Sequence, residues 1–386
     1  MKILQVIASA DPKSGGVIEG VLQTSSSFVA MGHQVTIACA DDRGSRWLES
    51  LPIQTYALGS IKWLRGFSIG LIAWLVKHIR EYDFIIVNGL WNSATLAASI
   101  ALRKRGAPYA VFPHGMMDPW FRHQYPLKHW LKQISWLVSE GPLLSGAKAV
   151  LFTSEDELVR SKKEFLGYKY KSNVVGYGIG DPAGSIDNQK AAFLKAMPEL
   201  VDRPFLLFLS RIHAKKGIDI LLDAFGALSP IPDNLRLVVA GPDQVGMKEE
   251  LLTRCEVLGI KNKVHWPGML TGQAKWGAYR LAEAFILPSH QENFGIVVAE
   301  AMACATPVLI TNKVNIWREV EKSGAGLVEN DDAAGIELLI RRFMALSSDQ
   351  RALMGSSARE CFEENFDVEH VSQSLIELMS NVVLKR

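Results

Sequence analysis

The sequence predicts an α/β protein made of two doubly wound domains, each built on a parallel sheet. Short apolar segments alternate with longer amphipathic ones along nearly the whole chain, which is the pattern of parallel strands joined by helices. The 386 residues exceed one ordinary hydrophobic core and suit two domains of about 150–200 residues each. A loop-like, glycine-containing stretch at 173–187 interrupts the alternation, so we expect the first domain to end at about residue 178.

The composition is that of a globular protein without a membrane span. Hydrophobic residues make up 48% and charged residues 21% of the chain. No run of about 18 apolar residues occurs, and the chain enters an apolar strand at once, without the organisation of a signal peptide. The cysteines are far apart and lack metal-ligand spacing, so we interpret Cys39, Cys255, Cys304 and Cys361 as small core residues. We therefore expect a cytoplasmic protein.

The first domain is expected to hold five strands, at 2–8, 32–39, 84–87, 109–112 and 147–154. The last of them leads into a helix whose start carries the hydroxyl-then-acid pattern of an N-terminal cap. Amphipathic helices are expected at 61–67 and 71–76.

Several candidate site residues follow these strands, at the edge of the sheet where doubly wound domains bind ligands. Gly15 and Gly16 form the turn after the first strand, although an ordinary strand-to-helix turn has the same appearance. Asn88 and Trp91 follow the strand at 84–87, and an ordinary loop packed on the next helix explains them equally well. His114 follows the strand at 109–112 beside a glycine, where it can face a ligand.

Positive charge is concentrated in the first domain. Residues 1–180 hold 20 Lys and Arg against 13 Asp and Glu, a net charge of +7, whereas the remainder holds 22 against 27, a net charge of −5. The segment 120–136 interleaves aromatic residues with Arg122, Lys128 and Lys132. Such a helix suits an anionic membrane surface or a pocket for a lipid-linked saccharide, so peripheral membrane contact is a hypothesis. The alternative is a helix packed on the sheet with a solvated basic edge.

In the second domain, a strand at 204–210 delivers Arg211 to its carboxyl end, and Lys216 follows before a helix at Ile218. Two cations at this place suit a diphosphate leaving group, whose developing charge needs stabilisation. The next strand, 235–240, ends at Gly241, and a further strand begins at 264. Strands at 284–287 and 308–311 and a helical tail from about 347 complete this domain.

The stretch 288–307 carries the strongest chemical pattern of the chain. A helix begins near Gly295 after a polar turn, and the free backbone N–H groups of such a helix start favour a phosphate. Glu292 precedes the helix start and Glu300 lies in the helix, from where its side chain leans back toward the start. Carboxylates accept hydrogen bonds from vicinal diols, so this pair predicts a ligand with a sugar at each end of a phosphate group.

The spacing Glu292-x7-Glu300 with Phe294-Gly295 inside it, together with Arg211-x4-Lys216, resembles the retaining glycosyltransferases of family 4. Their GT-B fold consists of two Rossmann-like domains that face each other across a cleft. The resemblance implies an acceptor domain at 1–178, a nucleotide-sugar donor domain at 179–370, and a last helix at about 371–386 that packs back on the first domain.

The resemblance also implies roles for individual residues. Glu292 contacts the donor sugar, Glu300 the nucleotide ribose, and Arg211 with Lys216 the diphosphate. His114 contacts the donor sugar and helps to orient the acceptor, whereas Asn88 and Trp91 stand where many family members have histidines, which leaves the acceptor contacts open. The remaining expected donor contacts are Gly15, Gly16, Gly241, Gly268, Met269, Asn293, Phe294, Gly295 and Ile296.

The expected reaction is transfer of a hexose from a nucleotide diphosphate sugar to a saccharide or lipid-linked saccharide in cell-surface polysaccharide synthesis, with retained anomeric configuration. UDP-glucose is favoured only because UDP and glucose are common in the family. The sequence has no Asp-x-Asp triplet, so we expect neither a metal nor a cofactor. The alternatives are a nucleotide-sugar epimerase of the same fold and a non-catalytic nucleotide-sugar-binding subunit of a polysaccharide assembly complex.

Overall fold

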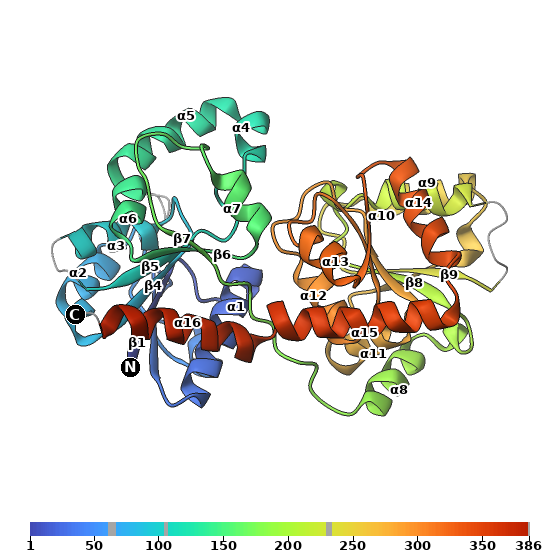
Figure 1. The fold of residues 1–386 in the computed structure, drawn as a ribbon, viewed down its shortest axis with the longest axis horizontal. Helices are drawn as coiled ribbons and strands as arrows, with labels where there is room; N and C mark the ends of the chain where they lie inside the picture. Colours follow the sequence, from blue (N-terminus) through green and yellow to red (C-terminus); the bar gives the residue numbers. More distant parts are fainter. Residues whose placement is uncertain (61–66, 104–106, 229–233, 385–386) are drawn as a thin grey trace. The chain divides into compact units, whose positions relative to one another are not determined.

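The chain folds into two compact units, seen in the computed structural model, which describes residues 1–60, 67–103, 107–228 and 234–384 (Figure 1). Unit 1 comprises Met1–Gly180 with Asp367–Arg386, and unit 2 comprises Asp181–Phe366. The sequence analysis placed these boundaries at 178/179 and 370/371. Each unit is a Rossmann-like domain with a parallel sheet between helices.

Unit 1 contains a sheet of seven parallel strands in the order β3-β2-β1-β4-β5-β6-β7. The central strands consist almost entirely of buried apolar residues, as expected for a parallel sheet covered on both faces. The strands are β1 (Lys2–Ile7), β2 (Gln34–Cys39), β3 (Gln54–Ala57), β4 (Phe84–Asn88), β5 (Tyr109–Phe112), β6 (Ala149–Phe152) and β7 (Ser172–Val174). The principal helices are α1 (Gly16–Ala30), α2 (Ile69–His78), α3 (Ser93–Arg103), α4 (Trp120–Gln124), α5 (Pro126–Ser135), α6 (Gly141–Gly146), α7 (Glu155–Ser161) and α16 (Val368–Val383).

Unit 2 contains a sheet of six parallel strands in the order β10-β9-β8-β11-β12-β13. The strands are β8 (Phe205–Leu209), β9 (Arg236–Ala240), β10 (Val264–Gly268), β11 (Ala284–Leu287), β12 (Val308–Thr311) and β13 (Gly326–Glu329). The principal helices are α8 (Ile186–Ala196), α9 (Ile218–Ala227), α10 (Lys248–Val257), α11 (Gly272–Leu281), α12 (Ile296–Ala303), α13 (Trp317–Ser323), α14 (Ala333–Met344) and α15 (Ser348–Asn365).

The structure adds strands that the sequence analysis did not predict, namely β3, β7 and β13. All three lie at an edge of their sheet, where strands are short and partly exposed and therefore lack a continuous apolar signal. The expected helix at 71–76 is α2, which begins at Ile69. The expected helix at 61–67 falls mainly on residues 61–66, which lie outside the described residues.

The last two helices belong to different units. α15 lies in unit 2, whereas α16 lies in unit 1 and packs against α1. Asp367 caps the start of α16 by accepting hydrogen bonds from the backbone N–H groups of Glu369 and His370. Across the described ranges, no helix is long and apolar enough to cross a membrane.

Candidate active site

The carboxyl edge of the unit 2 sheet consists of loops that are hydrogen-bonded to one another. The backbone N–H of Ser210 donates to the carbonyl of Ala240 at 3.0 Å, and that of Gly241 donates to Gly268 at 2.8 Å. A Cβ atom on Gly241 would lie 1.7 Å from the carbonyl oxygen of Ser210, so only glycine permits this approach. Gly241 thus holds the loops after β8, β9 and β10 together, whereas Met269 beyond β10 is exposed.

The loops after β8 and β11 are likewise interlocked, and they bring Lys216 to Glu292. The backbone N–H of His290 donates to the carbonyl of Lys215 at 2.9 Å. Gly217 has a φ of 64°, and a Cβ there would lie 2.2 Å from the carbonyl oxygen of Pro288. Lys216 Nζ forms an ion pair with the Glu292 carboxylate. Because Lys216 is only 9% exposed, its charge is directed at this edge of the sheet and not at bulk solvent.

Arg211 is the second expected cation, and it is held loosely. Its side chain is exposed, and Nη1 lies 3.5 Å from the side-chain oxygen of Gln244. The adjacent loop is fixed by Asp243, whose carboxylate accepts hydrogen bonds from the backbone of Gly246 at 2.8 Å and Lys248 at 3.0 Å. The hydrogen bond from the Lys248 backbone is the main cause that lowers the pKa of Asp243. The sequence analysis did not single out Asp243, although an Asp after Gly-Pro is typical of such a turn.

The start of α12 offers free backbone groups, as predicted. Gly295 has a φ of 82° and precedes the helix without any side-chain cap. Phe294 is buried and packs edge-on against Phe366 at a ring distance of 5.3 Å, so it contributes its backbone and not its side chain to this surface. Asn293 lies beside the loop after β12, where its side-chain oxygen is 3.4 Å from Asn315 Nδ2.

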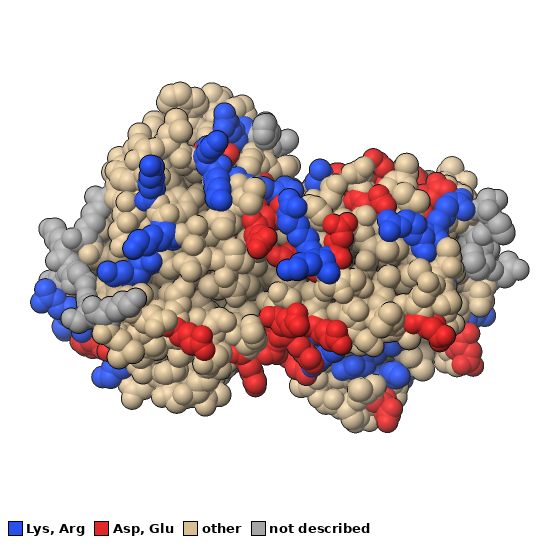
Figure 2. All heavy atoms as spheres, in the orientation of Figure 1, with Lys and Arg blue, Asp and Glu red and all other residues tan. Residues whose placement is uncertain are grey.

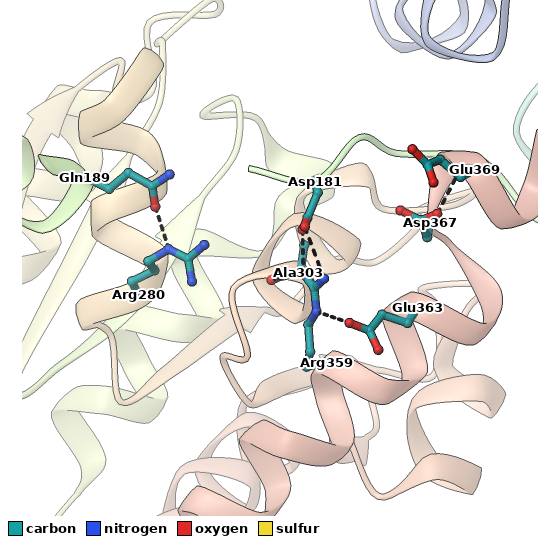
Figure 3. A network of polar contacts seen from close by, with 8 residues as sticks. All are labelled: Asp181, Gln189, Arg280, Ala303, Arg359, Glu363, Asp367 and Glu369. Atoms are coloured by element: carbon teal, nitrogen blue, oxygen red, sulfur yellow. Dashed lines mark hydrogen bonds and ion pairs between the residues drawn. The ribbon is translucent and has the colours of Figure 1, made fainter. Parts of the chain in front are cut away.

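The far end of α12 is anchored by Arg359 of α15, at the centre of the network in Figure 3. Its Nη1 donates to the carbonyl of Ala303 at 2.8 Å and to Asp181 at 2.5 Å, and its Nε donates to Glu363 at 2.6 Å. These contacts raise the pKa of Arg359, chiefly through the hydrogen bond to Asp181. The permanent charge therefore fixes the direction in which the helix start points.

Glu300 is buried, and both of its carboxylate oxygens have protein partners. Oε1 accepts from Lys275 Nζ at 2.7 Å, and Oε2 accepts from the Tyr279 hydroxyl at 3.0 Å. Burial and then the charge of Glu300 raise the pKa of Tyr279. The sequence analysis missed both partners, which lie on α11. Ribose binding by Glu300 stays a prediction, and it requires the ribose hydroxyls to share this carboxylate with Lys275.

In unit 1, a buried chain of side chains runs from Gln5 through Asn88 to His114. Asn88 Nδ2 donates to Gln5 Oε1 at 2.8 Å, and Asn88 Oδ1 lies 2.9 Å from His114 Nε2. Asn88 is only 2% exposed. The structure therefore places Asn88 behind His114, with its side-chain amide held by Gln5 and His114.

His114 itself is held in a constrained conformation. Its φ is 51°, which is uncommon for a residue other than glycine, and its ring stacks on Phe112 at 4.2 Å. The backbone N–H of Gly115 donates to Glu157 Oε1 at 2.6 Å, which fixes the following turn. Desolvation lowers the pKa of His114 to about 3, so the imidazole is neutral at pH 7. With the Asn88 amide oriented by Gln5, the proton belongs on Nε2, and Nδ1 can accept a hydrogen bond from a hydroxyl.

The remaining expected residues of unit 1 are Gly15, Gly16 and Trp91. Gly15 has a φ of 101° with open space around its Cα, and the Gly16 carbonyl accepts a hydrogen bond from the Tyr177 hydroxyl. Trp91 lines a cavity between α3 and α5, away from the side chain of Asn88. Among the described residues, no cluster of three or more His, Cys, Asp or Glu is arranged to hold a metal ion.

Two family models match the chain. The model described as "Glycosyl transferase 4-like domain" matches residues 15–161, and "Glycosyl transferases group 1" matches residues 190–361. A D-inositol 3-phosphate glycosyltransferase from Saccharomonospora viridis is 30% identical over 198 residues, which cover 49% of this chain and 45% of that protein. Mannosylfructose-phosphate synthase from Agrobacterium fabrum is 30% identical over 151 residues, which cover 36% of this chain and 33% of that protein. The chain thus matches less than half the length of these curated relatives.

Solved structures share the fold over the whole chain. HepE of Anabaena, in complex with UDP and glucose, has a TM-score of 0.75 at 20% sequence identity, covering 99% of this chain and 100% of that one. Sucrose-phosphate synthase from Thermosynechococcus elongatus has a TM-score of 0.79 at 19% identity, covering 100% of both chains. At such identities the likeness concerns the GT-B fold alone. The two family models match most of unit 1 and most of unit 2, and together they show that the chain belongs to glycosyltransferase family 4.

Proposed function

We propose that the protein transfers a hexose from a nucleotide diphosphate sugar to a hydroxyl acceptor, with retained anomeric configuration. The observation that carries the proposal is the Lys216–Glu292 ion pair beside the uncapped start of α12. This arrangement sets a cation, a carboxylate and free backbone N–H groups at one sheet edge. A sugar joined to a diphosphate needs these three kinds of group.

Each group has a distinct task in the proposed reaction. Lys216, Arg211 and the backbone of Gly295 and Ile296 stabilise the charge that develops on the diphosphate as the glycosidic bond breaks. Glu292 accepts hydrogen bonds from the donor sugar hydroxyls. The departing phosphate takes the proton of the attacking acceptor hydroxyl, so the same face of the sugar loses one bond and gains the other. No protein nucleophile takes part.

UDP-glucose is the donor that we propose, and the acceptor is a saccharide or a lipid-linked saccharide of a cell-surface polysaccharide. Structures of HepE in complex with UDP-glucose support the donor, since HepE shares the fold. For the acceptor, relatives named for inositol 3-phosphate and mannosylfructose phosphate support a hydroxyl compound that carries a phosphate. We place the protein at the cytoplasmic face of the membrane, in keeping with the net charge of +7 in residues 1–180.

No metal is needed in the proposed reaction, because Lys216, Arg211 and the start of α12 supply the positive charge that a divalent ion otherwise provides. Transfer is therefore expected to continue in EDTA. A rate that collapses in EDTA and recovers with added magnesium would contradict this part of the proposal.

Calorimetry with UDP-glucose, UDP-N-acetylglucosamine and GDP-mannose, followed by a slow-hydrolysis assay of the tightest ligand, tests the proposal directly. We expect UDP-glucose to bind and to release glucose slowly without an acceptor. Glu292→Gln keeps the shape of the side chain and is expected to reduce hydrolysis about a hundredfold. Near-normal turnover of that variant would reject the role of Glu292. Conversion of the donor to another UDP-sugar would identify an epimerase, and binding without turnover would identify a non-catalytic subunit.

A further inference from the structure

Helix α5 of unit 1 has its apolar side facing solvent, which is the reverse of the usual arrangement of a surface helix. Leu127, Leu131, Ile134 and Val138 recur at spacings of three and four residues, and all are exposed, with Leu127 at 83%. Trp130 adds an aromatic ring that is 70% exposed. Exposure of such an apolar stripe to water is unfavourable, so the stripe predicts an apolar surface as its partner.

The charge around this stripe identifies the partner. From Pro119 to Ser139 the sequence has no Asp or Glu, whereas it has Arg122, Lys128 and Lys132. Exposed aromatic and aliphatic side chains beside cations are the composition of helices that lie in the headgroup region of an anionic bilayer. In Figure 2, the part of unit 1 that holds α4 and α5 in Figure 1 shows blue spheres on a largely uncharged surface.

The face of α5 next to this stripe lines a cavity of about 490 Å³ between α5 and the start of α3. Lys128, Lys132, Ser135 and Ser139 face this cavity and repeat with the same spacing as the apolar stripe. Leu131 belongs both to the stripe and to the cavity wall, so the cavity opens beside the stripe. The π-helical turn Trp136–Glu140 continues α5 and carries Ser139 to the cavity wall.

The wall of this cavity combines buried polar groups with a cation. The hydroxyl of Ser139, a residue only 6% exposed, and the indole N–H of Trp91 are buried without a hydrogen-bond partner among the described residues. Lys132 Nζ lies 4.3 Å above the Trp91 ring, and burial lowers the pKa of this lysine, with Glu164 acting in the opposite direction. The two lysines that line this cavity, Lys128 and Lys132, are charged hydrogen-bond donors, so they favour a ligand rich in acceptor oxygens.

Glu140 is the only acidic residue that lines the cavity in the described part of the chain, and it is turned toward the protein. Its Oε2 accepts a hydrogen bond from the Ser135 hydroxyl at 2.7 Å. Burial raises the pKa of Glu140, opposed by hydrogen bonds from Ser135 and from the backbone of Trp91. Lys128 and Lys132 therefore dominate the charge at the cavity mouth.

We propose that the cavity between α3 and α5 binds the phosphate head of a membrane lipid while the stripe of α5 lies on the bilayer. The occupant is a phosphomonoester or phosphodiester lipid that enters sideways past Leu131. Lys128 and Lys132 donate hydrogen bonds to its phosphate oxygens. The identity of the lipid as the acceptor rests on the proposed function. The lipid site itself does not, because it includes none of the donor-binding residues.

Co-flotation at low ionic strength tests the surface, with vesicles of phosphatidylcholine alone or of phosphatidylcholine with phosphatidic acid. The protein is expected to float only with the second kind. Leu127→Ser with Trp130→Ser is expected to abolish flotation, whereas Leu353→Ser, at a leucine of unit 2 that is 67% exposed, leaves it unchanged. A wild-type protein that stays at the bottom of the gradient, or equal effects of the two changes, would overturn the surface assignment.

Calorimetry without membranes tests the cavity, with farnesyl monophosphate as a water-soluble probe. Lys128→Gln with Lys132→Gln is expected to weaken binding about thirtyfold, at about 1 kcal/mol for each cation. Leu127→Ser with Trp130→Ser leaves this binding unchanged, because those side chains lie outside the cavity. Equal binding by the lysine variant, or tighter binding of glucose 6-phosphate than of farnesyl monophosphate, would overturn the lipid site.

Hydrolysis of UDP-glucose without an acceptor, measured on the same variants, separates the two proposals. Normal hydrolysis together with absent lipid binding would reject the lipid site and leave the proposed transferase reaction intact. Normal lipid binding without any hydrolysis would reject the transferase reaction and leave the lipid site intact.

Discussion

Lys216 and Glu292 act on each other before any donor is present. The sequence places them 76 residues apart, yet they form an ion pair at the carboxyl edge of the unit 2 sheet. An ammonium group so close to the carboxylate orients both side chains toward the space above the sheet edge. In the proposed reaction, the arriving diphosphate competes for Lys216 and releases Glu292 to bind sugar hydroxyls.

Replacement of Lys216 by methionine tests whether Lys216 stabilises the diphosphate in the proposed reaction. The variant is expected to hydrolyse UDP-glucose about a hundredfold more slowly, since a positive group is missing where charge develops. Its neighbour Lys215, whose Nζ lies 3.3 Å from Gln291 Oε1, provides a matched control because Lys215→Met removes the same charge one residue away. Initial rates with saturating UDP-glucose measure both effects. Equal losses in the two variants would mean that only the net charge of the loop matters.

His114 makes a prediction about stability and pH. Its pKa is lowered from 6.5 to about 3 in the folded protein, so the unfolded chain binds a proton that the folded chain does not. The contribution of neutral His114 to the free energy of unfolding is fully present above pH 6.5. It is lost as the pH falls toward 3, at up to about 1.4 kcal/mol for each pH unit. His114→Gln retains a donor for Asn88 but does not titrate, so we expect the variant to lose less stability on acidification.

Urea unfolding of both proteins at pH 7 and pH 5 measures the difference. The pKa of His33, His129 and His265 is also lowered by burial, but these residues are present in both proteins, so their effect cancels in the comparison. Parallel losses of stability in the two proteins would show that His114 titrates normally in the folded state.

At the level of elements, the strand order β8-β11 decides where the site lies. These strands are adjacent in the sheet although β9 and β10 separate them in sequence. Their loops meet at Gly217, where the backbone comes so close to Pro288 that no side chain fits. The β8–α9 and β11–α12 connections thus form one rigid unit that carries both Lys216 and Glu292.

Gly217→Ala tests how far the site depends on this contact. Gly324 supplies a matched control, because it has a similar left-handed conformation, with a φ of 72° against 64°, but open space around it. Gly324→Ala is expected to cost about 1 kcal/mol from backbone strain alone. Gly217→Ala adds a steric clash with Pro288 and is expected to cost more and to reduce UDP-glucose hydrolysis. Thermal unfolding and initial rates measure these effects, and equal behaviour of the two variants would contradict the close approach.

On the scale of the whole molecule, the expected site residues are divided between two units. Arg211, Lys216, Glu292 and Glu300 belong to unit 2, whereas His114 belongs to unit 1. The hydrogen bonds that fix the unit 2 residues run within that unit alone. In the proposed reaction, unit 2 therefore supplies the groups that bind the nucleotide diphosphate.

Hydrogen exchange with and without UDP tests whether the nucleotide binds to unit 2. UDP lacks the sugar, so we expect it to slow exchange in unit 2, at residues 210–217, 241–247 and 293–298, more than in any part of unit 1. The ligand stabilises the state in which these loops are hydrogen-bonded to one another. Protection that is strongest in unit 1 would place the nucleotide elsewhere and would reject the donor site.

The residues proposed for the site could be selected from the sequence, because the signals that single them out are local. A buried apolar strand that ends in Arg211 or His114, and a polar turn before the helix at Gly295, each span only a few neighbouring residues. The five strands predicted in each domain follow from the same local signal. The short edge strands β3, β7 and β13 do not, because exposed strands carry no continuous apolar run.

Tertiary structure alone decided which groups meet. The Lys216–Glu292 pair, the contacts of Glu300 with Lys275 and Tyr279, and the position of Asn88 behind His114 all join segments distant in sequence. Such contacts depend on strand order and on which residues come close enough to exclude a side chain, and no local pattern records either. The sequence by itself determined the chemistry available at the sheet edges, whereas packing determined how that chemistry is arranged.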